Sequence, residues 1–165
     1  EALIRDFEQR PNGLLGIREE AGQAAGEFSA IGCEALIRDF EQRPNGLLGI
    51  RVEGGRRFRV EQAKVLPDQL TLGQVHWLAE ADEQPLQTEH ADLLALHGAL
   101  SAHPLVASLG MQLEPTGQQA LANQLAYLLP LAAEDKLHLL ALPEPLARLE
   151  YLQHMLEQLQ GQLGG

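Results

Sequence analysis

The stretch Leu47–Leu78 reads LLGIRVEGGRRFRVEQAKVLPDQLTLGQVHWL, and in it short apolar runs alternate with polar residues. Alternation with a period of two is typical of half-buried β-strands. Glycine and proline interrupt the pattern at intervals of a few residues, as they do between the strands of a sheet. The sequence therefore predicts a β-meander, whose strands we expect at 35–40, 47–52, 57–61 and 71–78.

Three turns are expected to join these strands. Glu53-Gly54-Gly55-Arg56 predicts a tight hairpin, because a Gly-Gly pair can adopt the positive φ values of two-residue turns. Pro44-Asn45-Gly46 and Pro67-Asp68-Gln69 carry the residues preferred in turns. In the strand after the Gly-Gly pair we expect Phe58 and Val60 to point inward and the flanking arginines to point outward.

Beyond residue 87 the apolar residues change to a helical period. Thr88 is a suitable N-cap, and the leucines that follow recur three or four residues apart. Prolines interrupt the pattern, and the connections between the segments are short, so we expect antiparallel neighbouring helices. The expected helices cover about 88–102, 117–129, 133–142 and, starting from Pro143 and Pro145, the segment to about 159.

The charge distribution changes at the same point in the chain. Residues 1–78 hold ten basic and twelve acidic residues, whereas residues 79–165 hold two basic and eleven acidic ones. Such an asymmetry between halves indicates a domain boundary. We therefore expect an α+β protein with a β-rich lobe at 1–80 and an antiparallel helical lobe at 81–165.

An identical 18-residue segment occurs twice, at 1–18 and at 34–51. A solenoid needs about three or more units and tolerates drift between them. Two copies without drift favour a recent duplication or an artefact over a repeat fold. Identical segments can compete for one place in a sheet, which raises the hypothesis of a homodimer or a strand-swapped oligomer.

Catalysis is not indicated by the motifs of the chain. The serines Ser29, Ser101 and Ser108 and the lysines Lys64 and Lys136 do not form a Gly-x-Ser-x-Gly or Ser-x-x-Lys motif. No phosphate-binding loop ending in Gly-Lys-Ser/Thr occurs either. The sequence thus predicts a protein that is not an enzyme and has no catalytic residues.

Metal and cofactor binding are not indicated either. His90 and His97 are seven residues apart, too far for both rings to hold one metal in the usual i, i+4 manner, so we expect a solvated helix face. Cys33 has no neighbouring base to lower its pKa, which favours a buried or bystander thiol. We predict no metal site and no cofactor.

The densest basic patch is Arg56–Arg59, with Phe58 inside it, and a basic hairpin with an aromatic residue can contact RNA. The net charge of −11 opposes a large polyanion as the partner, because such binding depends on clustered basic residues. RNA binding is therefore kept as the alternative function. The chain also lacks an apolar run of the roughly 18 residues that a membrane span needs, and we expect a cytoplasmic protein.

Several segments resemble the N-terminal domain of the Lon protease family, also called the Lon substrate-binding domain. The run Asn45–Val60, with its Gly-Gly-Arg-Arg-Phe, is similar to a strand region of that family. Four helical segments resemble elements of the family in the same order, and the resemblance covers about residues 13–160. These segments are Glu89–Leu94, Asn123–Leu131, Asp135–Leu140 and Pro145–Glu150.

The resemblance implies a PUA-like β-barrel followed by a helical lobe, as in small stand-alone bacterial proteins without the ATPase and protease modules. It also implies a non-catalytic module that recognises unfolded or tagged polypeptides through apolar side chains or a strand edge. The family's opening strands have no counterpart here, although Leu14, Leu15 and Ile17 can serve as one of them, and open edges or apolar surface would result. We regard Phe58 and Trp77 as core residues, so no binding residue is named from the sequence.

Overall fold

The structure is a computed structural model, and the chain divides into two compact units, Glu1–Glu80 and Ala81–Gly165. We call them the β unit and the helical unit and describe each separately. The first copy of the repeat, with Leu14, Leu15 and Ile17, lies outside the described residues, so the strand-swapping hypothesis stays a prediction. The structure describes residues 29–42, 44, 46–67, 71–107 and 114–163, the last five of these without their side chains.

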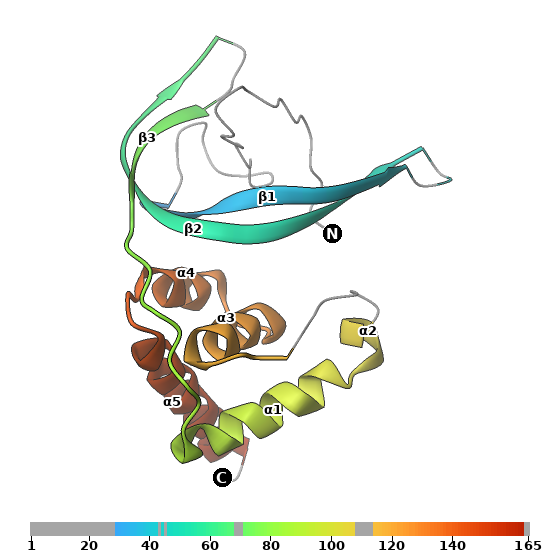
Figure 1. The fold of residues 1–165 in the computed structure, drawn as a ribbon, viewed down its shortest axis with the longest axis vertical. Helices are drawn as coiled ribbons and strands as arrows, with labels where there is room; N and C mark the ends of the chain where they lie inside the picture. Colours follow the sequence, from blue (N-terminus) through green and yellow to red (C-terminus); the bar gives the residue numbers. More distant parts are fainter. Residues whose placement is uncertain (1–28, 43, 45, 68–70, 108–113, 164–165) are drawn as a thin grey trace. The chain divides into compact units, whose positions relative to one another are not determined.

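The β unit contains the strands β1 (Ile31–Gln42), β2 (Leu48–Val65) and β3 (Thr71–Trp77). They form an antiparallel sheet in the order β1-β2-β3, as Figure 1 shows. The turn between β1 and β2 includes Gly46, whose φ of +79° is the left-handed conformation that favours glycine. The sequence-based expectation of a meander in an α+β fold is confirmed.

The predicted hairpin at Glu53–Arg56 is wrong, because β2 runs through these residues without turning. Gly54 and Gly55 both lack a positive φ. The pairing between β1 and β2 shifts between Cys33↔Arg57 and Ala35↔Gly54, so β2 holds one more residue than β1 at this point. The extra residue falls in Gly55-Arg56, next to the paired Gly54, so the glycine pair lies at a β-bulge inside a long strand, which is another common place for glycine in strands.

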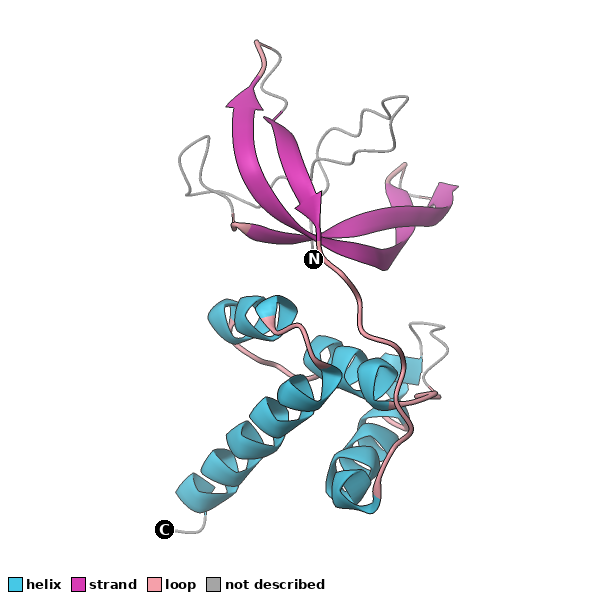
Figure 2. Ribbon diagram, turned by 60° about the vertical axis from the view of Figure 1, so that its left-hand side comes forward, coloured by secondary structure: helices cyan, strands magenta, loops and turns pink. Residues whose placement is uncertain are grey.

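The described part of the helical unit consists of helices and the loops between them, which Figure 2 shows in cyan and pink, and it follows the predicted helices closely. Each of the four predicted helices begins and ends within a few residues of its expected bounds. One short helix after His103 was not expected, because Pro104 was interpreted as a helix end and instead begins the next turn. The elements are η1 (Thr88–His90), α1 (Ala91–Ser101), α2 (Pro104–Ala107), α3 (Gln118–Leu128), α4 (Ala133–Ala141) and α5 (Pro145–Leu163).

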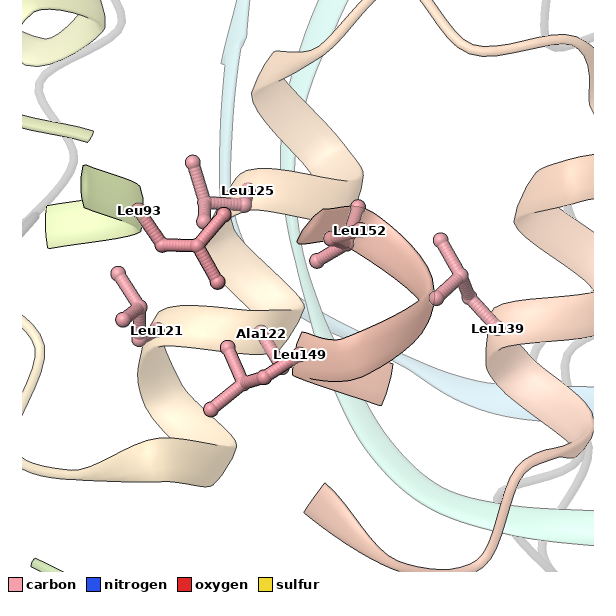
Figure 3. Close-up of a cluster of buried hydrophobic side chains, with 7 residues drawn as sticks. All are labelled: Leu93, Leu121, Ala122, Leu125, Leu139, Leu149 and Leu152. Atoms are coloured by element: carbon pink, nitrogen blue, oxygen red, sulfur yellow. The ribbon is translucent and has the colours of Figure 1, made fainter. Parts of the chain in front are cut away.

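The core of the helical unit is a cluster of leucines and one alanine contributed by α1, α3, α4 and α5 (Figure 3). Each fully buried leucine contributes roughly 2 kcal/mol by leaving water. None of the described helices is both long and apolar enough to cross a membrane. The members of the cluster are Leu93, Leu121, Ala122, Leu125, Leu139, Leu149 and Leu152.

The segment before η1 closes the N-terminal end of α3. The carboxylate of Glu83 accepts the backbone N–H groups of Gln119 at 2.7 Å and of Ala120 at 3.1 Å. These donors lack partners within the helix, and a negative charge at this end is stabilising. Gly117 permits the close approach, because a Cβ there would lie 2.5 Å from the carbonyl oxygen of Gln84.

Arg148 fixes the connection between α4 and α5 from a buried position. Its Nε donates to the carbonyl oxygen of Leu142 at 3.0 Å, and one terminal nitrogen donates to that of Pro143 at 3.2 Å. The other terminal nitrogen donates to Asn123 Oδ1 on α3 at 3.0 Å. The guanidinium thereby satisfies carbonyl groups that follow the last turn of α4 and connects two helices of the core.

Candidate functional site

Apolar side chains gather on one face of the paired strands β1 and β2. Ile37 lies opposite Val52, and Phe40 lies opposite Ile50. Leu48 is on β2 as well, two residues before Ile50. Directly opposed residues share a face, as do residues two apart on one strand. We call these five residues, Ile37, Phe40, Leu48, Ile50 and Val52, the ribbon face.

Four of the five side chains of the ribbon face are exposed, and the fifth, Ile50, is half-buried. Phe40 is 71% exposed and Leu48 is 62% exposed, while Val52 and Ile37 are 43% and 37% exposed. Single exposed apolar residues are common on proteins, but a contiguous group of them indicates a surface that binds another molecule.

The opposite face of the same two strands carries ion pairs. Arg51 donates to Asp39 across the pair of strands at 3.1 Å, and Arg38 donates to Glu53 at 2.6 Å. The hydrogen bond from Arg38 holds the pKa of the exposed Glu53 carboxyl below its ordinary value. Because these charges pair with one another, this side of the ribbon does not present an uncompensated basic surface.

Arg57 contradicts the expectation that the arginines of β2 point outward. Its side chain is 6% exposed, and its Nε donates to Glu80 Oε1 at 2.8 Å. The backbone N–H of Arg57 donates to the same oxygen at 3.3 Å, and its carbonyl oxygen accepts the N–H of Leu78. The chain that follows β3 therefore returns over Arg57 and covers it, which alternation along β2 alone does not indicate.

Arg56 is also engaged within the β unit. Its guanidinium lies 3.8 Å from the centre of the Trp77 ring and 3.5 Å from the carboxylate of Glu34. Trp77 packs edge-on against Phe58 with ring centres 5.8 Å apart, yet it remains 37% exposed and so belongs only partly to a core. Two of the three arginines of this patch, Arg56 and Arg57, face carboxylates or an aromatic ring, so the patch offers little to a phosphate backbone. The RNA-binding alternative is therefore not supported.

The two histidines expected on a solvated helix face are instead buried, each 4% exposed. His97 Nε2 lies 2.7 Å from Gln124 Oε1 and connects α1 to α3. His90 Nδ1 accepts the backbone N–H of Gln87 at 3.1 Å, at the start of η1. His90 at the end of η1 and His97 on α1 are both buried, and each ring has a hydrogen-bond partner, which helical spacing alone does not indicate.

Cys33 and the described serines are engaged with the backbone. Burial raises the pKa of the Cys33 thiol, which lies 3.3 Å from the carbonyl oxygen of Gly55. Ser29 Oγ accepts the N–H of Ile31, and Ser101 donates to the carbonyl oxygen of His97. Among the described residues no group of three His, Cys, Asp or Glu side chains is placed to hold a metal ion. The ribbon face is thus the strongest candidate site.

Sequence reasoning did not identify the ribbon face, although a signal for it was present. The apolar residues Leu48, Ile50 and Val52 alternate with Gly49, Arg51 and Glu53, which predicts one apolar side of a strand. Alternation shows that a strand has such a side but does not show whether anything packs on it. The exposure of these residues had to come from the structure.

The chain was compared with known protein families and structures. The sequence model described as ATP-dependent protease La (LON) substrate-binding domain matches residues 1–158. The Lon N-terminal domain protein from Xanthomonas campestris is 32% identical with a TM-score of 0.60, over 76% of this chain and 68% of that one. The N-terminal domain of Mycobacterium avium complex Lon protease is 21% identical with a TM-score of 0.49, over 79% of this chain and 71% of that one. No curated protein matches the chain.

The family model extends over both the strands and the helices described above. The Xanthomonas structure is similar to this chain in both sequence and fold. Both matches agree with the resemblance to the Lon N-terminal domain that was found in the sequence segments. This chain belongs to the Lon protease substrate-binding domain family.

Proposed function

We propose that this chain is a non-catalytic module that binds polypeptides through the ribbon face, and that its ligands are the exposed apolar segments of unfolded or tagged proteins. The observation that carries the proposal is the exposure of the ribbon face, above all of Phe40 and Leu48. The name of the family supports it, because it describes a substrate-binding domain.

The chemistry of the ribbon face suits a ligand that offers apolar side chains and little charge. Burying a large apolar side chain contributes about 1.5–3 kcal/mol. Association and the ordering of a flexible segment cost about 4–15 kcal/mol, so a few such contacts give moderate affinity. We expect dissociation constants in the micromolar range, which allow a ligand to be released again.

A titration with a permanently unfolded polypeptide tests the proposal. The ligand is a fluorescently labelled protein whose cysteines are reduced and carboxymethylated, and the readout is fluorescence anisotropy. Replacing two exposed apolar residues by the double substitution Phe40→Ser/Leu48→Ser is expected to weaken binding by about tenfold or more, because two contacts are lost.

The matched control removes two exposed apolar residues from the helical unit. Leu105 is 73% exposed and Tyr127 is 58% exposed, so the double substitution Leu105→Ser/Tyr127→Ser changes surface hydrophobicity to a similar extent. We expect this control to bind like the unmodified chain. Equal loss in both double variants, or no binding by the unmodified chain above that of a folded globular protein, would contradict the proposal.

A further inference from the structure

The helical unit contains a pocket that the proposed function does not use. It lies between the start of α1 and the first turns of α5 and has a volume of about 280 Å³. This volume is just below the range of pockets that hold drug-sized ligands, so it suits a small group. Leu93, Leu146 and Leu149 supply its apolar lining.

Two polar atoms of the pocket residues are buried without a hydrogen-bond partner. His90 Nδ1 accepts the N–H of Gln87, so in the neutral ring the proton is on Nε2, and this nitrogen is a donor. Nε2 makes no hydrogen bond, although it lies 3.5 Å from the exposed carboxylate of Glu89. The second atom is Gln153 Oε1, an acceptor whose amide orientation is fixed by the bond from its Nε2 to Glu157.

A donor and an acceptor that both lack partners match the two ends of an amide group. A C=O group can accept from His90, and an N–H group can donate to Gln153. Buried polar groups without partners are rare in folded proteins, because each bears the cost of leaving water. Both atoms have almost no accessible surface, so a ligand reaches them only when the side chains of His90 and Gln153 turn toward the pocket, and a ligand that then satisfies both atoms removes that cost.

The other side chains of the pocket narrow the choice of ligand. Glu89, Glu150 and Glu157 line it together with His154, and these carboxylates repel an anion. A cationic ligand would be attracted by them but would leave the donor at His90 without an acceptor. A neutral amide satisfies the buried atoms and tolerates the acidic surroundings.

We propose that this pocket binds a neutral amide group of a polypeptide, either a backbone peptide unit or the carboxamide of Asn or Gln. The leucines of the pocket contact the aliphatic carbon atoms on either side of the amide. The pocket belongs to the helical unit and the ribbon face to the β unit, so each proposal can fail without the other.

An NMR titration of the ¹⁵N-labelled full chain tests the proposal with four blocked tripeptides, acetyl-Gly-Xaa-Gly-methylamide, in which Xaa is Gln, Ala, Glu or Lys. We expect saturable shifts at His90 and Gln153 at ligand concentrations up to about 10 mM, the range for so small a ligand. Stronger binding of the Gln peptide identifies a side-chain carboxamide, and equal binding of the Ala peptide identifies the backbone. Tightest binding of the Lys peptide, or no saturable shift with any peptide, would overturn the proposal.

A variant of the acceptor provides the second measurement. The substitution Gln153→Met keeps the size of the side chain and removes the acceptor, and we expect about fivefold weaker binding of the amide peptide. Gln74→Met, on the exposed surface of β3, is the matched control and should leave the affinity unchanged. Circular dichroism shows that both variants are folded. Unchanged affinity of the folded Gln153→Met chain would contradict the assignment.

Discussion

The two units differ in the burial of their apolar side chains. In the helical unit seven buried hydrophobic residues from four helices pack into one cluster. Among the described residues of the β unit, Ile31 is the one buried hydrophobic residue, while Phe40, Leu48 and Val52 remain largely exposed. The same chain therefore contains a closed core and an open apolar face.

Under the proposed function, the two units have different roles. A helical cluster with completely buried leucines can supply stability by itself, because its apolar surface has already left water. The ribbon face contributes little to stability, and its hydrophobic free energy is still available for binding. Substitutions that separate these two contributions test the comparison.

The largest effect is expected in the leucine cluster. Leu121 is fully buried, so Leu121→Ala removes packed atoms and leaves a cavity, at a cost of about 4 kcal/mol in the free energy of unfolding. Urea denaturation followed by circular dichroism at 222 nm measures it. Leu105→Ala, at a 73% exposed position, is the control and should change stability by less than about 0.5 kcal/mol. A similar loss in the free energy of unfolding at both positions would contradict the close packing of Leu121 in the core.

The buried ion pair of the β unit should give the next effect. Glu80→Ala removes the carboxylate that faces the 6% exposed guanidinium of Arg57, and we expect a cost of about 3 kcal/mol, since Glu80 itself is one-third exposed. Trp77, the one tryptophan of the chain, reports unfolding of this unit by fluorescence. Glu53→Ala breaks the exposed pair with Arg38 and should have little effect. A small loss in the free energy of unfolding for Glu80→Ala would show that the burial of Arg57 does not depend on the Glu80 carboxylate.

Two glycines of the sheet offer a smaller test with a matched control. A Cβ at Gly32 would lie 2.5 Å from the ring of Phe58, so Gly32→Ala forces the ring to move and should cost about 2 kcal/mol. A Cβ at Gly73 would meet its nearest neighbour at 3.6 Å, which is ordinary contact, so Gly73→Ala should be tolerated. Chemical denaturation followed by Trp77 fluorescence compares them, and equal stabilities would show that Phe58 does not pack over Gly32.

The smallest effect concerns the reactivity of Cys33. Because burial raises the pKa of its thiol, the thiolate that reacts with iodoacetamide is scarcer in the folded chain than in the urea-unfolded chain at the same pH. We expect the folded chain to react more slowly at pH 8, with a rate that still increases at pH values where the unfolded chain has levelled off. Identical pH profiles would contradict the burial of this thiol.

Much of the fold was predictable because local signals decide it. Proline positions and leucine spacing gave the bounds of α1, α3, α4 and α5 to within a few residues. Gly54 and Gly55 were misinterpreted, because a glycine pair suits both a hairpin and a bulge, and the strand that pairs with it decides between them. The choice therefore depends on β1, which lies some twenty residues earlier in the chain.

The site was harder to predict, because exposure and burial are properties of the tertiary structure. Arg57 is buried by the chain after β3, and His90 and His97 are buried by partners on other segments. Conversely, the alternation in β2 places Leu48 and Val52 on one apolar side of the strand, but it does not indicate that this side is exposed. Local pattern identifies the face of an element, and only packing shows what covers it.

Site-specific crosslinking shows whether unfolded polypeptides bind at the ribbon face. The photoreactive residue p-benzoylphenylalanine is placed at position 40 in one sample and at position 127 in another, since Phe40 and Tyr127 are both aromatic and largely exposed. Each sample is irradiated with the carboxymethylated unfolded polypeptide. We expect a crosslinked product from position 40 and little or none from position 127. A product from position 127 without one from position 40 would contradict the ribbon face as the binding surface.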